Sequence, residues 1–365
     1  MSVKSVLVAA SLALSIIIGL VLRRDSGATN VESTGKKRIQ IGLSLDTLKE
    51  ARWQADRDLF VAKAKELGAE ALVQSANSDD TRQMQDIEAL ISRGVRALVI
   101  VAHDSKTMAR AVDIAHKSKI PVIAYDRMIR DADVDLYVSF DNMKVGEQQA
   151  KYLIDHLPGG KGKIIRIHGA PTDDNAKILK EGQDKILKPY IDRGDIQVVH
   201  EDWAEEWKPE NGKKITNAAI TRVGRDIDAV FCANDGLAGG AIQALTEEGL
   251  VDKVVVTGQD AELAAVQRIA AGTQAMTIYK PLVQLARTAA DAAVKLATGK
   301  PIVARASVNN GKFDVPAILG DTMVVTKDNL LDTVVKDGFH SYDDVFRSVP
   351  ADKRPPRPAA VAKSP

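Results

Sequence analysis

Short apolar segments alternate with longer amphipathic segments through most of the chain. The pattern is clearest at Val122–Tyr125, where Pro121 precedes an uninterrupted apolar run that ends in the charged pair Asp126-Arg127. A short apolar run bounded in this way is typical of a parallel strand that is buried on both faces. In open α/β sheets, ligands bind beyond the carboxyl ends of such strands. The sequence therefore predicts that Asp126 and Arg127 lie at the edge of a binding cleft.

This alternation of strands and helices runs through the chain twice. In the first half, strands are expected at Ile39–Leu45, Ala71–Gln74, Ala97–Val101 and Val122–Tyr125. In the second half, they are expected at Tyr137–Phe140, Ile164–His168, Gln197–His200, Ala229–Ala233 and Val254–Gly258. Alternation at this spacing predicts an α/β fold with a doubly wound parallel sheet. Because the pattern repeats, we expect two similar lobes that face each other across a cleft.

Polar residues recur where the expected strands end and where the next helices begin. These residues are Arg52, Asp126, Arg127, Asp173, Asn175, Asn234, Asp260 and Lys280, and the three tryptophans Trp53, Trp203 and Trp207 stand near them in the sequence. Planar groups with paired donors or acceptors match vicinal hydroxyls, which donate and accept together. An indole ring can cover the C–H face of a sugar. The balance of both charge signs favours a neutral, hydroxyl-rich ligand over a phosphate or a carboxylate.

Several of these residues also have a purely structural interpretation. Asp46 and Asp260 are equally consistent with helix N-caps, and Trp53 with a core position on an amphipathic helix. Arg127 is consistent with an ion pair to Asp126 at a solvated edge, and Lys280 with an ordinary exposed lysine. It is the recurrence of such residues at corresponding positions of both halves that favours a binding site.

Composition and missing motifs exclude several classes of function. Lys plus Arg number 50 and Asp plus Glu 49, so the net charge of +1 gives no electrostatic footprint for nucleic acid. The single cysteine, Cys232, cannot form an internal disulfide and is expected in the core. The chain contains no G-x-G-x-x-G, G-x-x-x-x-G-K-[ST], G-x-S-x-G or C-x-x-C motif, and no histidine pair at metal-ligand spacing. We therefore expect no cofactor, no metal and no catalytic residues.

Both ends of the chain differ in character from the rest. Lys4 precedes the apolar run Val6–Leu22, which has about the length of a secretory h-region or a short membrane span. This pattern predicts export to the periplasm, with the segment either cleaved as a signal peptide or retained as an anchor. No cysteine follows the run, which excludes a lipoprotein anchor. The tail from Val349 is rich in proline and is expected to stay unfolded.

Longer motifs in the chain resemble a known family. They are Glu50–Asp58, Val73–Asn77, Ala124–Ile129, Ser139–Asn142, Asp174–Lys177, Asn234–Asp235, Gly239–Leu245, Gly258–Ala261, Arg268–Gln274 and Tyr279–Pro281. Together they resemble the D-xylose-binding proteins of bacterial ABC transporters, which are type I periplasmic sugar-binding proteins. The resemblance runs from about Ile39 to His340 and leaves out the apolar N-terminal segment and the proline-rich tail.

The resemblance implies two Rossmann-like doubly wound parallel-sheet lobes, joined by three hinge crossovers near residues 140–143, 279–281 and 304–308. The apolar run predicts a signal or anchor segment with a linker at 1–37, and the resemblance implies an N-terminal lobe from 38–141 plus 281–305. The C-terminal lobe would comprise 142–280 plus 306–345, and 346–365 would form a disordered tail. The implied sugar contacts are Arg52, Trp53, Asp126, Arg127, Asp173, Asn175, Trp207, Asn234, Asp260 and Lys280. Two loop positions depart from the family, His103-Asp104 and His168.

The function implied by the resemblance is capture of a monosaccharide, with D-xylose as the expected sugar, by closure of two lobes. The expected partner is an ABC permease, with a chemoreceptor as a further partner and a monomer as the oligomeric state. Glucose, ribose or another pentose remains an alternative ligand. A sugar-sensing repressor of the same fold would need a helix-turn-helix before the first strand, where this chain has an apolar run. A sugar-cleaving enzyme would use Asp126 and Asp260 as its carboxylate pair.

Overall fold

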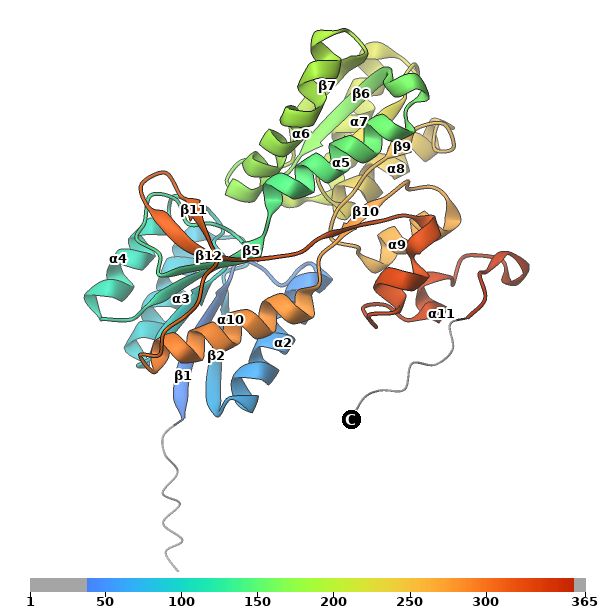
Figure 1. Ribbon diagram of the computed structural model, residues 1–365. Coiled ribbons are helices and arrows are strands. Elements are labelled where there is room, and N and C mark those ends of the chain that lie inside the picture. Colours follow the sequence, from blue (N-terminus) through green and yellow to red (C-terminus); the bar gives the residue numbers. More distant parts are fainter. Residues whose placement is uncertain (1–37, 358–365) are drawn as a thin grey trace, which may run out of the picture. The chain divides into compact units, whose positions relative to one another are not determined.

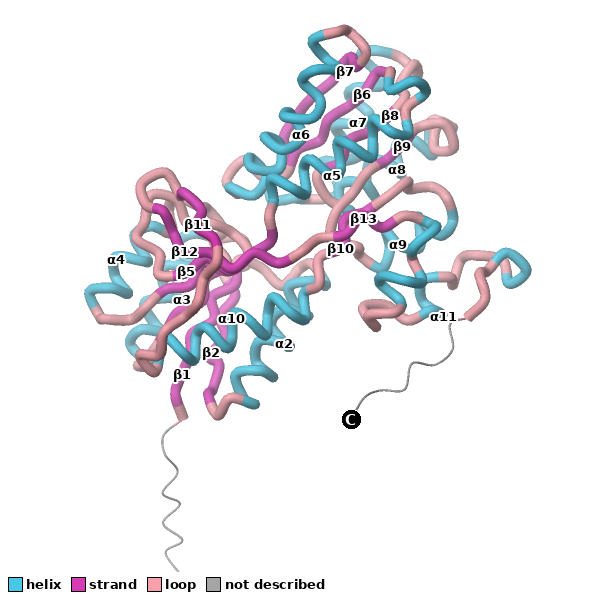
Figure 2. Tube along the Cα trace, viewed as in Figure 1, coloured by secondary structure: helices cyan, strands magenta, loops and turns pink. Residues whose placement is uncertain are grey.

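The computed structural model describes residues 38–357 (Figures 1 and 2). The apolar run Val6–Leu22 and the last eight positions of the proline-rich tail, 358–365, lie outside this range. Within residues 38–357, no helix has both the length and the apolar character that crossing a bilayer requires. The described chain builds two separate parallel sheets, and we name the parts around them the first and the second lobe.

The first lobe consists of residues 38–140 and 281–320 around a seven-stranded sheet. Its strands are β1 (Ile39–Leu45), β2 (Ala69–Ser75), β3 (Ala97–Ile100), β4 (Val122–Tyr125), β5 (Leu136–Phe140), β11 (Ala306–Asn309) and β12 (Asp314–Gly320). The strand order is β11-β12-β5-β4-β3-β1-β2, and every pair is parallel except the antiparallel hairpin β11–β12. The helices are α2 (Ala51–Glu66), α3 (Asp80–Ser92), α4 (Ala109–Lys117) and α10 (Leu282–Ala297).

Helices cover both faces of this sheet. Alternate residues of β3 point to opposite faces, so that Val99 packs against α2 and α10 while Leu98 packs against α3 and α4. Phe60 of α2 is almost fully buried on the first of these faces. In Figure 1, α10 lies beside α2 although the two helices are far apart in the sequence. Burial of each large apolar side chain contributes roughly 1.5–3 kcal/mol, and this packing fixes the strand ends that carry the site.

The second lobe consists of residues 142–279 and 323–357 around a four-stranded parallel sheet of order β7-β6-β8-β9. Its strands are β6 (Gly162–His168), β7 (Ile196–Trp203), β8 (Ala229–Cys232) and β9 (Val255–Val256), and β10 (Thr277–Tyr279) pairs separately with β13 (Met323–Val325). Its helices are α5 (Asn142–His156), α6 (Asp174–Asp192), α7 (Pro209–Val223), α8 (Asp235–Glu247), α9 (Leu263–Ala271) and α11 (Tyr342–Val345). Cys232 is a free cysteine that is buried in the hydrophobic core of this lobe, as the sequence predicts.

The chain passes between the lobes after β5, after β10 and after β12. The first two passages lie within the segments 140–143 and 279–281. The third was expected at 304–308, and this prediction was wrong. Residues 306–320 form the hairpin β11–β12, which extends the first sheet beside β5, so the passage comes only at 321–322. The alternation of exposed Asp314 and Pro316 with buried Val315 and Ala317 is typical of a strand near a sheet edge, and it marks this hairpin.

The C-terminal segment also differs from the expectation of disorder from 346 onward. Phe346 and Val349 are buried against Val325 and Val334 of the second lobe. The hydroxyl of Tyr342 donates a hydrogen bond of 2.6 Å to the carbonyl of Pro355. The many prolines of the tail suggested disorder, although the spacing of Phe346 and Val349 allows both side chains to pack on one surface. Residues 346–357 therefore belong to the ordered second lobe.

Candidate functional site

All ten residues that the sequence singles out as sugar contacts line one pocket between the lobes. The pocket holds about 540 Å³ of space free of protein atoms, part of which is open to solvent. The first lobe supplies Arg52 and Trp53 from α2, and Asp126 and Arg127 from the end of β4. The second lobe supplies Asp173 and Asn175 at the start of α6, Trp207, Asn234 before α8, and Asp260, while Lys280 lies on the second passage between the lobes. Convergence of these side chains is thus observed, whereas their contact with a ligand stays a prediction.

Asp126 is held in an unusual backbone conformation at the end of β4. Its φ of 61° lies in the left-handed region, which non-glycine residues seldom adopt. Its carbonyl oxygen accepts hydrogen bonds from the hydroxyls of Tyr137 and Ser139 and from the side-chain amide of Asn175. Its backbone N–H donates to Val138 at 2.8 Å. These four bonds hold the conformation and aim the carboxylate at the pocket.

Arg52 is the centre of a charged cluster on the first lobe. Its guanidinium lies 2.6 Å from the carboxylate of Asp126, 3.3 Å from Asp56 and 3.5 Å from Asp260 of the second lobe. The same guanidinium stacks 4.1 Å from the ring centre of Trp53, a favourable cation–π contact. Trp53 is therefore both a core residue of the first lobe and a wall of the pocket. The helix α2 thus places the guanidinium of Arg52 in the pocket, where three carboxylates surround it.

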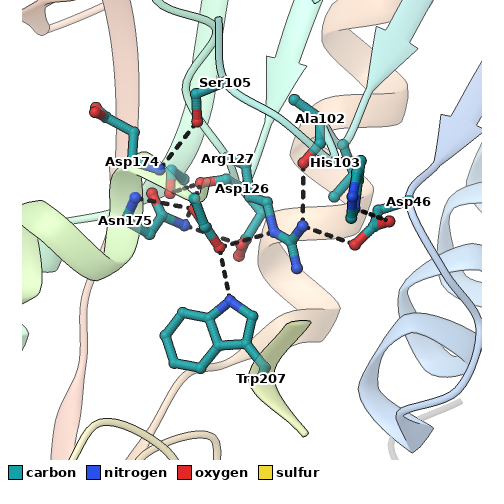
Figure 3. Close-up of polar contacts among 12 residues, drawn as sticks. Asp46, Ala102, His103, Ser105, Asp126, Arg127, Asp174, Asn175 and Trp207 are labelled. Atoms are coloured by element: carbon teal, nitrogen blue, oxygen red, sulfur yellow. Dashed lines mark hydrogen bonds and ion pairs between the residues drawn. The ribbon is translucent and has the colours of Figure 1, made fainter. Parts of the chain in front are cut away.

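Arg127 makes a second such cluster (Figure 3). Its Nη1 donates to Oδ2 of Asp46 at 2.8 Å and to the carbonyl of Ala102 at 3.0 Å. Its Nε lies 3.0 Å from the carboxylate of Asp173, which belongs to the second lobe. Asp46 is therefore a buried ion-pair partner of Arg127, and this contact replaces the N-cap interpretation of its place after β1. His103 contacts the other oxygen of Asp46 at 2.9 Å.

The second lobe presents its polar groups at helix starts. Asp173 accepts a hydrogen bond from the backbone N–H of Asn175 and so caps α6, and Asn234 caps α8 in the same way through Leu237. Capping uses only part of each side chain, and both residues still line the pocket. Asp260, with φ of 94°, pairs with Lys280 at 3.0 Å. Lys280 is buried, so the interpretation as an exposed lysine does not hold.

Trp207 closes one side of the pocket. Its indole N–H donates to the carboxylate of Asp173 at 3.1 Å. Its ring lies directly over Gly169, where a Cβ atom would come within 2.0 Å of Cη2. Only glycine therefore allows the ring to take this place. Trp203 does not line the pocket and instead lies against His168.

Burial and charge shift the pKa values of the acidic groups in different directions. Burial opposes ionisation of Asp126, but Arg52 and Lys280 outweigh it and lower the pKa of this carboxyl. Burial raises the pKa of Asp173 and of Glu50. Burial, assisted by repulsion from Asp260, raises the pKa of Glu262 to about 7.

The ten residues carry balanced charge. Three cations, Arg52, Arg127 and Lys280, face three carboxylates, Asp126, Asp173 and Asp260, and each cation has at least one carboxylate within 3.0 Å. A ligand that carries a charge of its own would upset this balance. The arrangement can donate and accept many hydrogen bonds around a neutral molecule, with two indole rings for its apolar surface.

Residues 41–301 match the family model for the periplasmic binding protein domain. The chain belongs to this family. It is 50% identical over 317 residues to the D-xylose-binding periplasmic protein of Escherichia coli, covering 87% of this chain and 95% of that protein. It is 46% identical to the protein of the same name from Haemophilus influenzae, covering 88% and 96% of the two chains. A solute-binding protein from Chloroflexus aurantiacus, solved in complex with D-glucose, superimposes with a TM-score of 0.79 at 33% identity, covering 84% and 98%.

Family membership and the two sheets agree with the type I periplasmic binding protein fold predicted from the sequence. Five further residues line the pocket that the sequence reasoning did not include: Glu50, Asn142, Leu179, Gln259 and Glu262. Asn142 begins α5 just after β5, separated from it by Asp141, and Gln259 precedes Asp260, so the rule that selected the other residues at strand ends and helix starts would also have selected these two. Glu50 and Gln259 each have a buried side-chain oxygen without a protein hydrogen-bond partner, which marks both as available to a ligand.

The two histidines that were expected to depart from the family lie near the site but outside the pocket. His103 joins Asp46, as described above, and His168 lies 2.6 Å from Glu201 on the second lobe. Within the part of the chain that the structure describes, no three histidine, cysteine or acidic side chains are grouped so as to hold a metal ion.

Proposed function

We propose that this chain is a periplasmic solute-binding protein that captures one monosaccharide, D-xylose, between its two lobes and delivers it to an ABC permease. The observation that carries the proposal is the pocket itself, in which three cations, the three carboxylates that pair with them, four amide side chains and two indole rings converge. The names of the relatives in Escherichia coli and Haemophilus influenzae support D-xylose as the sugar and the periplasm as the location.

The mechanism that we infer is closure on the sugar. Asp126 and Arg127 belong to the first lobe and Asp173, Asn175 and Asp260 to the second, so a sugar that contacts both sets favours the closed arrangement. Each hydroxyl that is buried without a partner costs about 1–3 kcal/mol, which makes the site selective against epimers and deoxy sugars. The three passages at 141, 280–281 and 321–322 are the hinge segments that this motion requires.

We propose binding rather than catalysis. A glycosidase would need one of its two carboxyls to be protonated near neutral pH. Asp126 has a lowered pKa because Arg52 and Lys280 favour its charged form over the opposing effect of burial, and Asp260 is paired with Lys280 at 3.0 Å. These pairs suit carboxylates that accept hydrogen bonds and argue against either Asp126 or Asp260 as a general acid. Incubation with aryl xylosides is expected to release no product.

The test is a titration of the purified protein with D-xylose, D-ribose, L-arabinose and D-glucose, followed by tryptophan fluorescence and calorimetry. Because Trp53 and Trp207 line the pocket, we expect D-xylose to change the emission and to bind most tightly. D-Glucose is in the panel because the solved relative from Chloroflexus aurantiacus holds it. If none of the four sugars produces heat or a spectral change, the proposed function is wrong.

Three further parts of the proposal concern partners. We propose a monomer, delivery to a permease of the ABC class, and a chemoreceptor as a second docking partner of the sugar-bound form. Size-exclusion chromatography with light scattering tests the first, and uptake of labelled D-xylose in cells with and without the protein tests the second.

A further inference from the structure

His103 is connected to the wall of the pocket by a continuous series of polar contacts. Its Nδ1 lies 2.9 Å from Oδ1 of Asp46, and Arg127 donates to Oδ2 of the same carboxylate at 2.8 Å. Arg127 lies 3.0 Å from Asp173, which accepts the indole N–H of Trp207 at 3.1 Å. Figure 3 shows His103 and Trp207 at the two ends of this series. Arg127, Asp173 and Trp207 line the pocket, whereas His103 and Asp46 do not.

We propose that His103 is a positioning residue for sugar binding, which acts on Arg127 through Asp46 and makes the affinity depend on pH. The inference rests on the proposed function, because its readout is the affinity for a sugar.

The structure holds the imidazole firmly enough for such a role. The backbone N–H of His103 donates to Gln83 at 2.9 Å, and the amide of Gln83 donates to the carbonyl of Val101 at 2.8 Å. Gln83 is fully buried, so the loop that carries His103 is fixed to α3 and β3. Asp46 is buried as well, and each of its oxygens contacts one side chain, the imidazole at Oδ1 and the guanidinium at Oδ2. Loss of the imidazole would free the carboxylate to rotate away from Arg127.

Charged groups surround His103 from several elements. The first lobe contributes Asp46 after β1, Asp80 at the start of α3, Asp104 in the same loop and Arg127 after β4. The second lobe contributes Glu206, whose charge interacts with His103. The hydrogen bond to Asp46 raises the pKa of His103 above its ordinary value although burial opposes this.

The sign of the pH effect follows from which of these groups belong to the second lobe. In the arrangement that the structure shows, Glu206 interacts with His103, and Asp173 pairs with Arg127, whose positive charge otherwise disfavours the imidazolium. Opening of the lobes would separate both pairs. The sugar-bound form therefore holds the proton on His103 more tightly than the open form does. By linkage, sugar affinity is highest below the pKa of His103 and falls as the pH rises through it.

The experiment compares wild type with His103→Asn and His103→Ala, each titrated with D-xylose by calorimetry from pH 5.5 to 8.5. The side-chain nitrogen of asparagine can take the place of Nδ1, so H103N keeps the donor to Asp46 but cannot titrate. Glu262, Glu50 and Asp56 also titrate near the pocket, but they are present in wild type and in H103N alike. The ratio of the two dissociation constants therefore isolates His103.

We expect H103N to bind D-xylose about as tightly as wild type at pH 8.5. At pH 5.5 we expect wild type to bind about threefold more tightly than H103N. The difference is small because a single surface carboxylate, Glu206, shifts the pKa of His103 by only a fraction of a unit. H103A is expected to bind about fivefold more weakly than H103N at every pH, because it lacks the donor to Asp46. Circular dichroism spectra establish that both variants are folded.

Two outcomes would overturn the inference while leaving the proposed function intact. A ratio of wild type to H103N that stays constant with pH would remove the pH dependence from His103. Equal affinities of H103A and H103N would remove its positioning role, because a residue that only fills space would not distinguish the two. If wild type binds no sugar at any pH, the proposed function fails, and the inference fails with it.

Discussion

Oδ1 of Asp260 lies 3.0 Å from Nζ of Lys280, and both residues line the pocket. Lys280 follows β10 on the second passage between the lobes, and its ammonium is almost completely buried. The same carboxylate oxygen lies 3.5 Å from the guanidinium of Arg52 on the first lobe. One acidic side chain thus holds two buried cations from different parts of the chain, which makes it the most informative single residue to change.

Replacing Asp260 by alanine is expected to weaken D-xylose binding by more than about tenfold, because it removes an acceptor and leaves Lys280 without its carboxylate partner. Calorimetry measures the affinity. Asp226→Ala is the matched control, since Asp226 is exposed and pairs only with Lys163 on the surface of the second lobe. Equal affinities of the two variants would remove Asp260 from the site.

Gly169→Ala tests whether sugar binding needs the indole ring of Trp207 in its position over Gly169. A Cβ atom at this position would lie 2.0 Å from Cη2 of the indole, so the ring must move and its hydrogen bond to Asp173 is lost. We expect an affinity loss of about tenfold for D-xylose, with a shifted emission spectrum in the absence of sugar. Trp207→Phe keeps an aromatic ring but lacks the N–H, and it is expected to cost about threefold. If G169A binds as wild type does, the ring position is not needed for binding.

Phe346→Ala tests whether the C-terminal segment is part of the second lobe. Phe346 packs with Val345 and Val349 in an apolar cluster, so the change is expected to lower the free energy of unfolding by about 3 kcal/mol. Urea unfolding followed by circular dichroism measures the effect. The control is Asp352→Ala, at an exposed position of the same segment. Equal midpoints for F346A and D352A would show that the segment contributes no stability.

The strand ends explain how much of the site could be predicted from sequence. Asp126 directly follows β4 and Asp260 lies in the loop after β9, and parallel strands bring their carboxyl ends to one edge of each sheet. Ten of the pocket-lining residues could therefore be predicted from the sequence. The sequence pattern could not reveal that Asp46 pairs with Arg127, because an aspartate after a strand is also a good N-cap for the next helix.

The predictions that failed concern strand pairing and side-chain contacts between residues that are distant in the sequence. Whether β12 joins the first or the second sheet depends on its pairing with β5, which no local pattern encodes. Glu50 enters the pocket from the turn before α2 and carries no strand-end signal. The tail was misjudged because its prolines suggested disorder, while two buried side chains are enough to hold it on the second lobe.

Glu262 gives the protein a pH-dependent stability whose sign can be worked out. Burial, followed by repulsion from Asp260, raises its pKa from 4.5 to about 7 in the folded state. Between pH 4.5 and 7 the folded protein therefore keeps a proton that the unfolded chain has released, and stability falls as the pH rises through this range. Above pH 7 both states are ionised, and the burial of the charge costs a constant amount.

The variant Glu262→Gln removes this cost. At about 1.4 kcal/mol for each pKa unit, Glu262→Gln is expected to be up to about 3 kcal/mol more stable than wild type at pH 8, and less where solvent screens the charge. At pH 5 the advantage should be much smaller, because the folded wild type is protonated there. Urea unfolding at the two pH values measures the difference. Glu248→Gln is the control, because Glu248 is exposed at the end of α8 and the change should shift both midpoints alike. A gain in E262Q of equal size at pH 5 and pH 8 would show that the carboxyl is ionised throughout, in contradiction to its burial beside Asp260.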